Sequence, residues 1–149
     1  MVSKVSRPPK VFTLDEANST LPLVSRILRD IVHCHEEIGE LKRARLHLLD
    51  STKGDASRHE RESDEVEEEI LRGRIRGKLA EIDSYFQELA KIGCECKDPK
   101  AGLVDFPAEL NERIVYLCWK LGESEISHWH ELEAGFAGRQ AVAGTFTGV

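Results

Sequence analysis

Apolar residues in the first third of the chain recur at alternating spacings of three and four positions. Such spacing places them on one stripe of an α-helix and is typical of a coiled-coil seam. Thr13 and Glu16 form a capping-box pattern that favours a helix start here. One position of the series, Arg45, is polar, and the apolar members are Leu14, Ala17, Leu21, Val24, Ile27, Ile31, Cys34, Ile38, Leu41 and Leu48. We therefore predict one long helix, whose simplest role is that of a scaffold.

A second seam follows an acidic stretch. Residues 51–69 carry eight acids and three bases, so most of the chain's net charge of −6 is local to this stretch. Within it, Lys53 to Asp55 has turn composition, and the remainder is interpreted as a solvated helix end or a disordered loop. We expect the second helix to run antiparallel to the first and to end at Gly93, a C-cap candidate. Lys78 interrupts its seam, which consists of Leu71, Ile75, Ile82, Tyr85, Leu89 and Ile92.

Beyond Gly93 the hydrophobic period shortens to two, which predicts β-strands. We expect a first strand at 94–97, a second at 103–106 that Pro107 stops, and a third at 113–121. Turn-forming residues separate these strands. The third strand should pack one face on the helices, through Val115, Leu117, Trp119 and Leu121. The predicted fold class is α+β: a long antiparallel helical hairpin with a small C-terminal three-stranded antiparallel meander.

The chain's length fits a single domain spanning residues 1–149. Within it we expect a disordered N-terminus, the helical hairpin, the meander with the segment that follows it, and a tail, over residues 1–11, 12–92, 93–140 and 141–149. A charged share of 32% suits long solvated helices, and the negative net charge makes a nucleic-acid partner unlikely. Neither a secretory signal nor a membrane-spanning apolar run is evident, which predicts a cytoplasmic protein with reduced cysteines. The first seam is longer than the second can cover, which predicts a homodimer or a protein partner on the seams.

Two segments carry a resemblance to a known family. They are FTLDEANSTLPLV near the N-terminus and CKDPKAGLVDFPAELNERIVYLCWKLGESEISHWHELEAGFAGRQ in the C-terminal third. These motifs resemble a bacterial family known as domain of unknown function 2203, whose name implies no activity. The family pattern has a Trp-His-acid run before Gly-Phe-x-Gly-Arg, which is matched here by Trp129, His130, Glu131, Gly135, Phe136, Gly138 and Arg139. Relatives often have an aromatic residue at the position of His128.

The run His128-Trp129-His130-Glu131, with Glu133 close behind, combines imidazole and carboxylate donors. Such donors suit zinc, iron or manganese. In an extended segment His128 and His130 share a face and Glu131 points away, whereas in a helix each histidine meets the acid three residues later. Asp105 is the first choice for a further ligand, because it interrupts an otherwise apolar strand. The alternative interpretation is that His130 is a buried, hydrogen-bonded hinge residue.

The glycines at 135 and 138 and the guanidinium of Arg139 form a second candidate, an anion site. Gly135 and Gly138 would let backbone N–H groups converge, and Arg139 can hold a phosphate or carboxylate bidentately. The alternative is a tight turn with Arg139 paired to a helix glutamate. A structural zinc site formed by Cys94, Cys96, Cys118 and His128 is a further possibility.

Two classes of function remain open. In the first, the protein binds a divalent metal through the histidine and acid cluster, as a small enzyme or a sensor. In the second, it is a non-catalytic, homo-oligomeric interaction or scaffold module whose helical seams dock a partner. The sequence identifies no catalytic residue.

Overall fold

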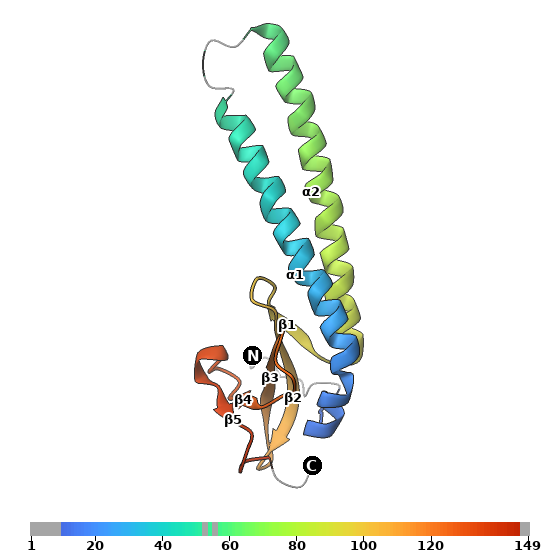
Figure 1. Cartoon of the computed structure of the whole chain (residues 1–149), viewed down its shortest axis with the longest axis vertical. Coiled ribbons are helices and arrows are strands. Elements are labelled where there is room, and N and C mark those ends of the chain that lie inside the picture. The colour runs from blue at the N-terminus through green and yellow to red at the C-terminus, as the bar shows by residue number, and fades with distance from the viewer. Residues whose placement is uncertain (1–9, 52–53, 55–56, 147–149) are drawn as a thin grey trace, which may run out of the picture.

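The sheet lies beside the base of the helical hairpin, and the hairpin tip extends away from it, which makes the molecule elongated (Figure 1). The computed structural model describes residues 10–51, 54 and 57–146, so the expectations for residues 1–9, Lys53, Asp55 and residues 147–149 lie outside the described residues. Helix α1 (Leu14–Ser51) packs antiparallel to α2 (Arg58–Ile92). The remaining elements are β1 (Glu95–Asp98), β2 (Leu103–Leu110), β3 (Arg113–Lys120), β4 (His128–His130), the 3-10 helix η1 (Phe136–Gly138) and β5 (Gln140–Ala141). The α+β class predicted from the sequence is confirmed.

Local hydrogen bonds fix where the two helices begin and end. The Glu16 carboxylate accepts from the Thr13 N–H at 3.0 Å, and the Glu16 N–H donates to the Thr13 hydroxyl at 3.1 Å, so the predicted capping box is confirmed. Gly93 closes α2 with a φ of 110°, as the C-cap prediction requires. A second capping box at Ser57 starts α2, which places most of the acidic stretch within this helix.

The two polar residues within the seams form ion pairs between the helices. Arg45 Nε lies 2.9 Å from Glu68 Oε1, and Lys78 Nζ lies 3.1 Å from Glu37 Oε2. Pairs this exposed contribute roughly 0–1 kcal/mol each to stability. Their effect is therefore mainly on register, because each fixes how far one helix is shifted along the other.

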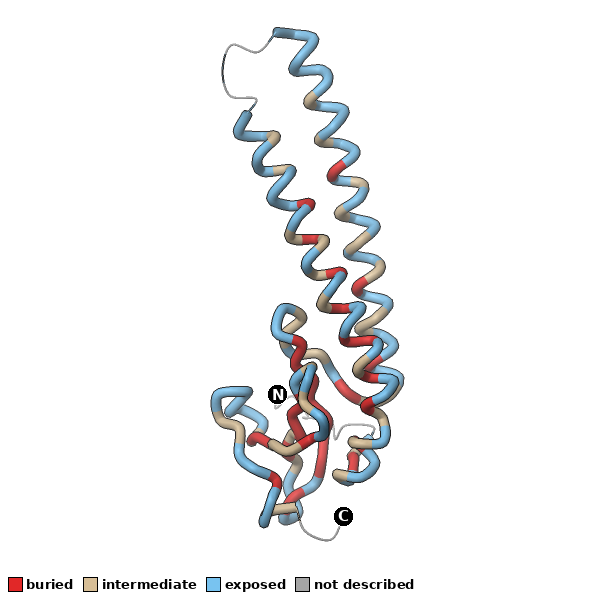
Figure 2. Tube along the Cα trace, viewed as in Figure 1, coloured by how far each residue is buried: buried red, intermediate tan, exposed pale blue. Residues whose placement is uncertain are grey.

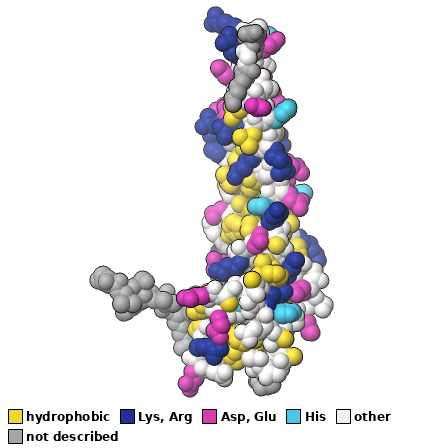
Figure 3. Space-filling model, turned by 90° about the vertical axis from the view of Figure 1, so that its left-hand side faces the viewer, with side chains coloured by type: hydrophobic (Ala, Val, Ile, Leu, Met, Phe, Trp, Pro, Cys, Tyr) yellow, Lys and Arg dark blue, Asp and Glu magenta, His cyan; other side chains and the backbone are white. Residues whose placement is uncertain are grey.

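Buried residues concentrate where the hairpin meets the sheet (Figure 2). Fully buried members of this core are Leu28, Ile31, Leu89, Phe106 and Leu117. Towards the hairpin tip the helices are mostly exposed, and Figure 3 shows hydrophobic side chains lying between charged ones along the hairpin. Leu46, for example, is 65% exposed. Neither described helix contains an apolar stretch long enough to cross a membrane.

The sheet has five strands in consecutive antiparallel order, so the prediction of three strands was wrong. The two additional strands, β4 and β5, have three and two residues. Strands this short show too little alternation for a hydrophobic period to be recognised. They add the segment that follows the meander to the sheet edge beside β3.

Pro107 does not stop β2, which continues to Leu110 and corrects the expected end at residue 106. The carbonyl of Pro107 accepts a hydrogen bond from the Phe12 N–H at 2.7 Å. Because the N and C=O of a strand residue point to the same side, the nitrogen of Pro107 points away from β3. The missing N–H therefore removes no bond from the ladder between β2 and β3.

Candidate metal centre

The side chain of Asp105 lies on the face of the sheet opposite to the one that packs on α1. Its neighbours on β2, Val104 and Phe106, are fully buried in the core with α1. Successive side chains of a strand point to opposite faces, so Asp105 points the other way. It is nevertheless only 3% exposed. A buried carboxyl group on an apolar strand requires a partner, because burial of an uncompensated charge is costly.

Strand register brings two further donors to this carboxyl group. Asp105 lies opposite Cys118 on β3, and Tyr116, two residues earlier on β3, lies opposite His130 on β4. Strands β2 and β4 are separated by β3 and lie about 9–10 Å apart. The Asp105 and His130 side chains meet across this gap above Cys118, whose side chain is short. One oxygen, one sulfur and one nitrogen of these three buried residues all lie within 4.8 Å of one another.

The hydrogen bonds of His130 determine which ring nitrogen faces the carboxyl group. Nδ1 lies 2.7 Å from the backbone carbonyl oxygen of Glu131, which can only accept, so Nδ1 carries a proton. In the neutral ring Nε2 then presents a lone pair. Nε2 is 3.0 Å from both carboxyl oxygens of Asp105. A lone pair and a carboxylate repel each other, so a proton or a cation has to lie between them.

Burial shifts the acidity of this group of side chains. It raises the pKa of Asp105 above the ordinary aspartate value, although His130 opposes the shift. The pKa of the Cys118 thiol is raised to about 12, mainly by burial and secondly by the nearby Asp105 carboxylate. The thiol therefore stays protonated near neutral pH unless a bound cation displaces the proton.

The other sequence-predicted metal ligands are not among these three donors, although His128 lies opposite Cys118 in the strand register. His128 shares a sheet face with His130, as expected for an extended segment, but its Nδ1 is 2.9 Å from the Ser127 hydroxyl. Glu131 forms an ion pair with Arg113 at the surface, and Glu133 is exposed. The structure thus brings Asp105 and His130 together, with Cys118 as a third donor. From the sequence, Cys118 was expected in a different group of donors, with Cys94, Cys96 and His128.

Arg139, the centre of the predicted anion site, is held by groups of the chain itself. One Nη atom lies 2.6 Å from Glu123 Oε1 and 3.4 Å from the Cys118 carbonyl oxygen. Gly135 has a φ of 60°, and Gly138 belongs to η1. Glu123 lies in the connection between β3 and β4, not on a helix. An external anion would have to compete with this carboxylate.

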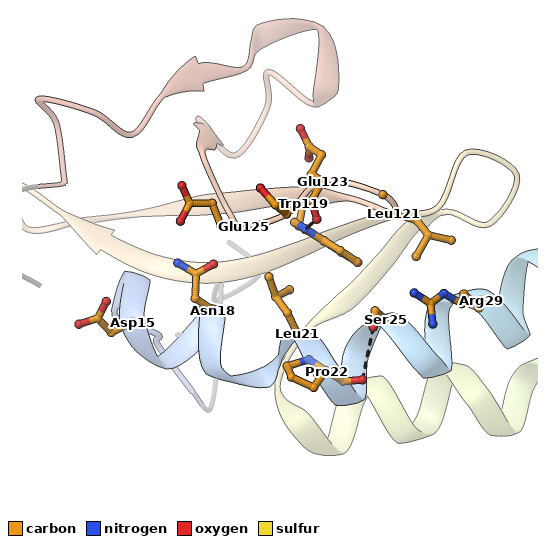
Figure 4. Close-up of a pocket in the computed structure, with 12 residues that line it drawn as sticks. Asp15, Asn18, Leu21, Pro22, Ser25, Arg29, Trp119, Leu121, Glu123 and Glu125 are labelled. Carbon is orange, nitrogen blue, oxygen red and sulfur yellow. Dashed lines mark hydrogen bonds between the residues drawn. The ribbon is translucent and has the colours of Figure 1, made fainter.

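Glu123 also lines an open hollow of about 620 Å³. Figure 4 shows this hollow between the first turns of α1 and the connection between β3 and β4. Asn18 on α1 joins the two sides, because its side-chain oxygen accepts from the Ile126 N–H at 2.8 Å. Acids outnumber bases in the lining, and none of the three metal donors belongs to it.

A different cleft, of about 490 Å³, reaches the candidate metal centre. It lies between the end of α2 and the sheet, and Asp105 is the one of the three donors that lines it. Cys94 and Cys96 border it, and burial raises their thiol pKa values to about 12 and about 11. The full lining is Phe86, Ala90, Gly93, Cys94, Glu95, Cys96, Asp105, Pro107 and Tyr116.

Comparisons with known proteins connect the chain to one family. A family model described as an uncharacterized conserved protein, DUF2203, matches residues 10–142. The match includes both helices, all five strands and the three candidate donors. Searches of curated proteins and of solved structures found no match.

Proposed function

We propose that this chain, which belongs to the DUF2203 family of uncharacterised conserved proteins, binds a divalent metal ion through Asp105, Cys118 and His130. The observation that carries the proposal is the approach of His130 Nε2 to both Asp105 oxygens at 3.0 Å. With Nδ1 committed to a backbone carbonyl, Nε2 is oriented as a ligand nitrogen. Metal-binding histidines are usually oriented in this way, by a hydrogen bond from the ring nitrogen that does not bind the metal.

The donor types favour some metals over others. A thiolate suits zinc or iron, whereas manganese prefers oxygen ligands. Zinc binds sulfur at about 2.3 Å and nitrogen or oxygen at about 2.0–2.2 Å. Donor atoms within 4.8 Å of one another can converge on one ion after small movements of the side chains. Three protein ligands would leave a position for water or another molecule, as in catalytic zinc sites.

Metal content of the tag-free, full-length protein tests the proposal. We expect near-stoichiometric zinc or iron in the wild type after purification or after incubation with the ion. His130→Ala should lower the metal content at least tenfold, because it removes a direct ligand. Asp105→Asn should also lower it, with little change of side-chain volume. Elemental analysis measures the content, and circular dichroism verifies that each variant is folded.

His128→Ala provides the matched control. This histidine lies two residues away on β4 and on the same sheet face, but its ring is hydrogen-bonded to Ser127. Its substitution should leave the metal content unchanged. Wild-type protein free of metal after incubation with zinc, iron(II) and manganese would contradict the proposal, as would equal loss in the two histidine variants.

An interaction module is the second candidate function. Support comes from apolar side chains that remain exposed along the hairpin, far from the sheet core, such as Leu46, Val66 and Ile70. Exposed apolar groups on an otherwise charged surface favour a docking role. This function does not require a metal and is compatible with one, because the hairpin tip and the candidate metal centre lie in different parts of the molecule (Figure 1).

A further inference from the structure

The outer face of α2 carries an apolar stripe that α1 does not cover. Val66, Ile70, Gly73 and Gly77 follow one another at spacings of four, three and four residues. At about 100° per residue they lie within about 60° of one another and about 140° from the buried face of α2. Val66 is 61% exposed and Ile70 is 56% exposed. Among the described elements, only α1 lies beside α2 at this height of the hairpin (Figure 1).

This stripe is complementary to itself when two copies run antiparallel. A twofold axis between residues 71 and 72 would place Val66 of each chain opposite the partner's Gly77. The same axis would place Ile70 opposite the partner's Gly73. Each branched side chain would thus enter a gap left by a glycine. Apart from its neighbours in the chain and the backbone of α2, a Cβ at Gly77 would meet no heavy atom of the described residues within 4 Å, and one at Gly73 would meet only the end of the Arg76 side chain at 3.9 Å. Both notches are therefore open to a second molecule.

The charges beside the stripe fit the same arrangement. Residues 58–69 carry seven acids and two bases, and residues 70–78 carry four bases and no acid. In antiparallel helices, residues on the same flank of the two seams are neighbours. Glu67 would then lie beside the partner's Arg74, and Glu69 beside the partner's Arg76. The twofold axis repeats both pairs, which gives four attractive contacts around the apolar stripe.

We propose that the chain forms a twofold homodimer through residues 66–77 of α2, packed antiparallel against the same segment of a second copy. This dimer does not depend on the proposed metal site. The next flanking contact would place Glu62 beside the partner's Asp83. Because these two acids repel each other, we expect the interface to end there. Such a short helical contact buries less than the roughly 1,200–2,000 Å² of a standard stable interface, and we expect a dissociation constant in the micromolar range.

Sedimentation equilibrium of the full-length protein, over concentrations up to several hundred micromolar, measures the dimer. The wild type should be in monomer–dimer equilibrium, and Ile70→Glu should raise the dissociation constant at least tenfold, because two buried charges would face glycine notches. Leu79→Glu is the matched control: Leu79 is 46% exposed on the same helix but lies off the stripe. A monomeric wild type, or equal effects of the two variants, would overturn the proposal.

Exchange of the flanking charges tests whether the partner is a second copy and whether the two helices run antiparallel. The double variants Glu67→Arg/Glu69→Arg and Arg74→Glu/Arg76→Glu should each dimerise at least tenfold more weakly than the wild type, because all four contacts become repulsive. Mixing the two should form heterodimers, in which all four contacts are again attractive. Absence of mixed dimers would refute the arrangement. A stronger dimer from Glu67→Arg alone would also refute it, since that result requires parallel helices with Glu67 beside the partner's Glu62.

Gly77→Ala separates helix stability from association. The added methyl group has open space in the single chain and raises helix propensity, so the melting temperature of the monomer should rise. The same methyl group fills the notch for Val66 of the second copy, so the dimer should weaken. A variant in which dimerisation strengthens together with the melting temperature would contradict the glycine notch.

Discussion

Replacing Phe106 with alanine is expected to lower the free energy of unfolding by about 3–5 kcal/mol, the usual range for a buried phenylalanine. Phe106 is fully buried, and its ring packs edge-on against Phe12, with ring centroids 5.3 Å apart. It lies in the core between α1 and the sheet. Its loss leaves a cavity where the two layers meet. Urea denaturation followed by circular dichroism measures the change.

Leu132→Ala serves as the control for this substitution. Leu132 is 47% exposed in the segment after β4, so its truncation should change stability by about 0.5 kcal/mol or less. A loss below about 1 kcal/mol for Phe106→Ala would show that the sheet and the helices do not share the core described here.

Zinc affinity is expected to rise about tenfold per pH unit from about pH 6.5 to about pH 8.5, because a thiol has to lose its proton to become a ligand. Burial and the Asp105 carboxylate raise the pKa of Cys118 to about 12, so this proton is still bound throughout that range. Isothermal titration in two buffers with different ionisation enthalpies gives both the affinity and the number of protons released. Cys118→Ser should reduce the slope.

The stability of the metal-free protein should show the opposite pH dependence and fall as the pH rises. The pKa of Asp105 is raised by burial, so the folded state binds this proton more tightly than the unfolded state. Its stabilising contribution is present below the unfolded pKa and is lost as the pH rises through the folded pKa.

Zinc affinity that is the same across the pH range would show that the thiol is not a ligand.

The helical hairpin could be predicted because its signals are local and repeated. Hydrophobic spacing extends over many turns, and Thr13 with Glu16 and the Gly93 cap mark helix ends by short-range chemistry. The Asn111–Glu112 turn was equally predictable, and both residues have the positive φ values of a two-residue hairpin. Each of these features depends only on residues close in sequence.

The candidate metal centre was predictable only in part. Asp105 was recognisable as a polar residue in an otherwise apolar strand, and His130 as a member of a run of imidazole and carboxylate donors. Cys118 was not assigned to the same site, because its place beside them depends on the register of three strands. The alternation of β3 gives a usable signal, since Tyr116 and Cys118 lie on the face opposite to Leu117 and Trp119. Strands β4 and β5 depend on pairing that their few residues do not reveal.

X-ray absorption spectroscopy of the zinc-loaded protein tests the central claim most directly, because it reports the atoms bound to the metal. Binding by Asp105, Cys118 and His130 predicts one sulfur at about 2.3 Å and nitrogen or oxygen at about 2.0–2.2 Å. Cys118→Ser should remove the sulfur contribution, whereas Cys96→Ser, at the cleft border, should not. A spectrum with nitrogen and oxygen only, or one unchanged by Cys118→Ser, would contradict a metal centre at these three residues.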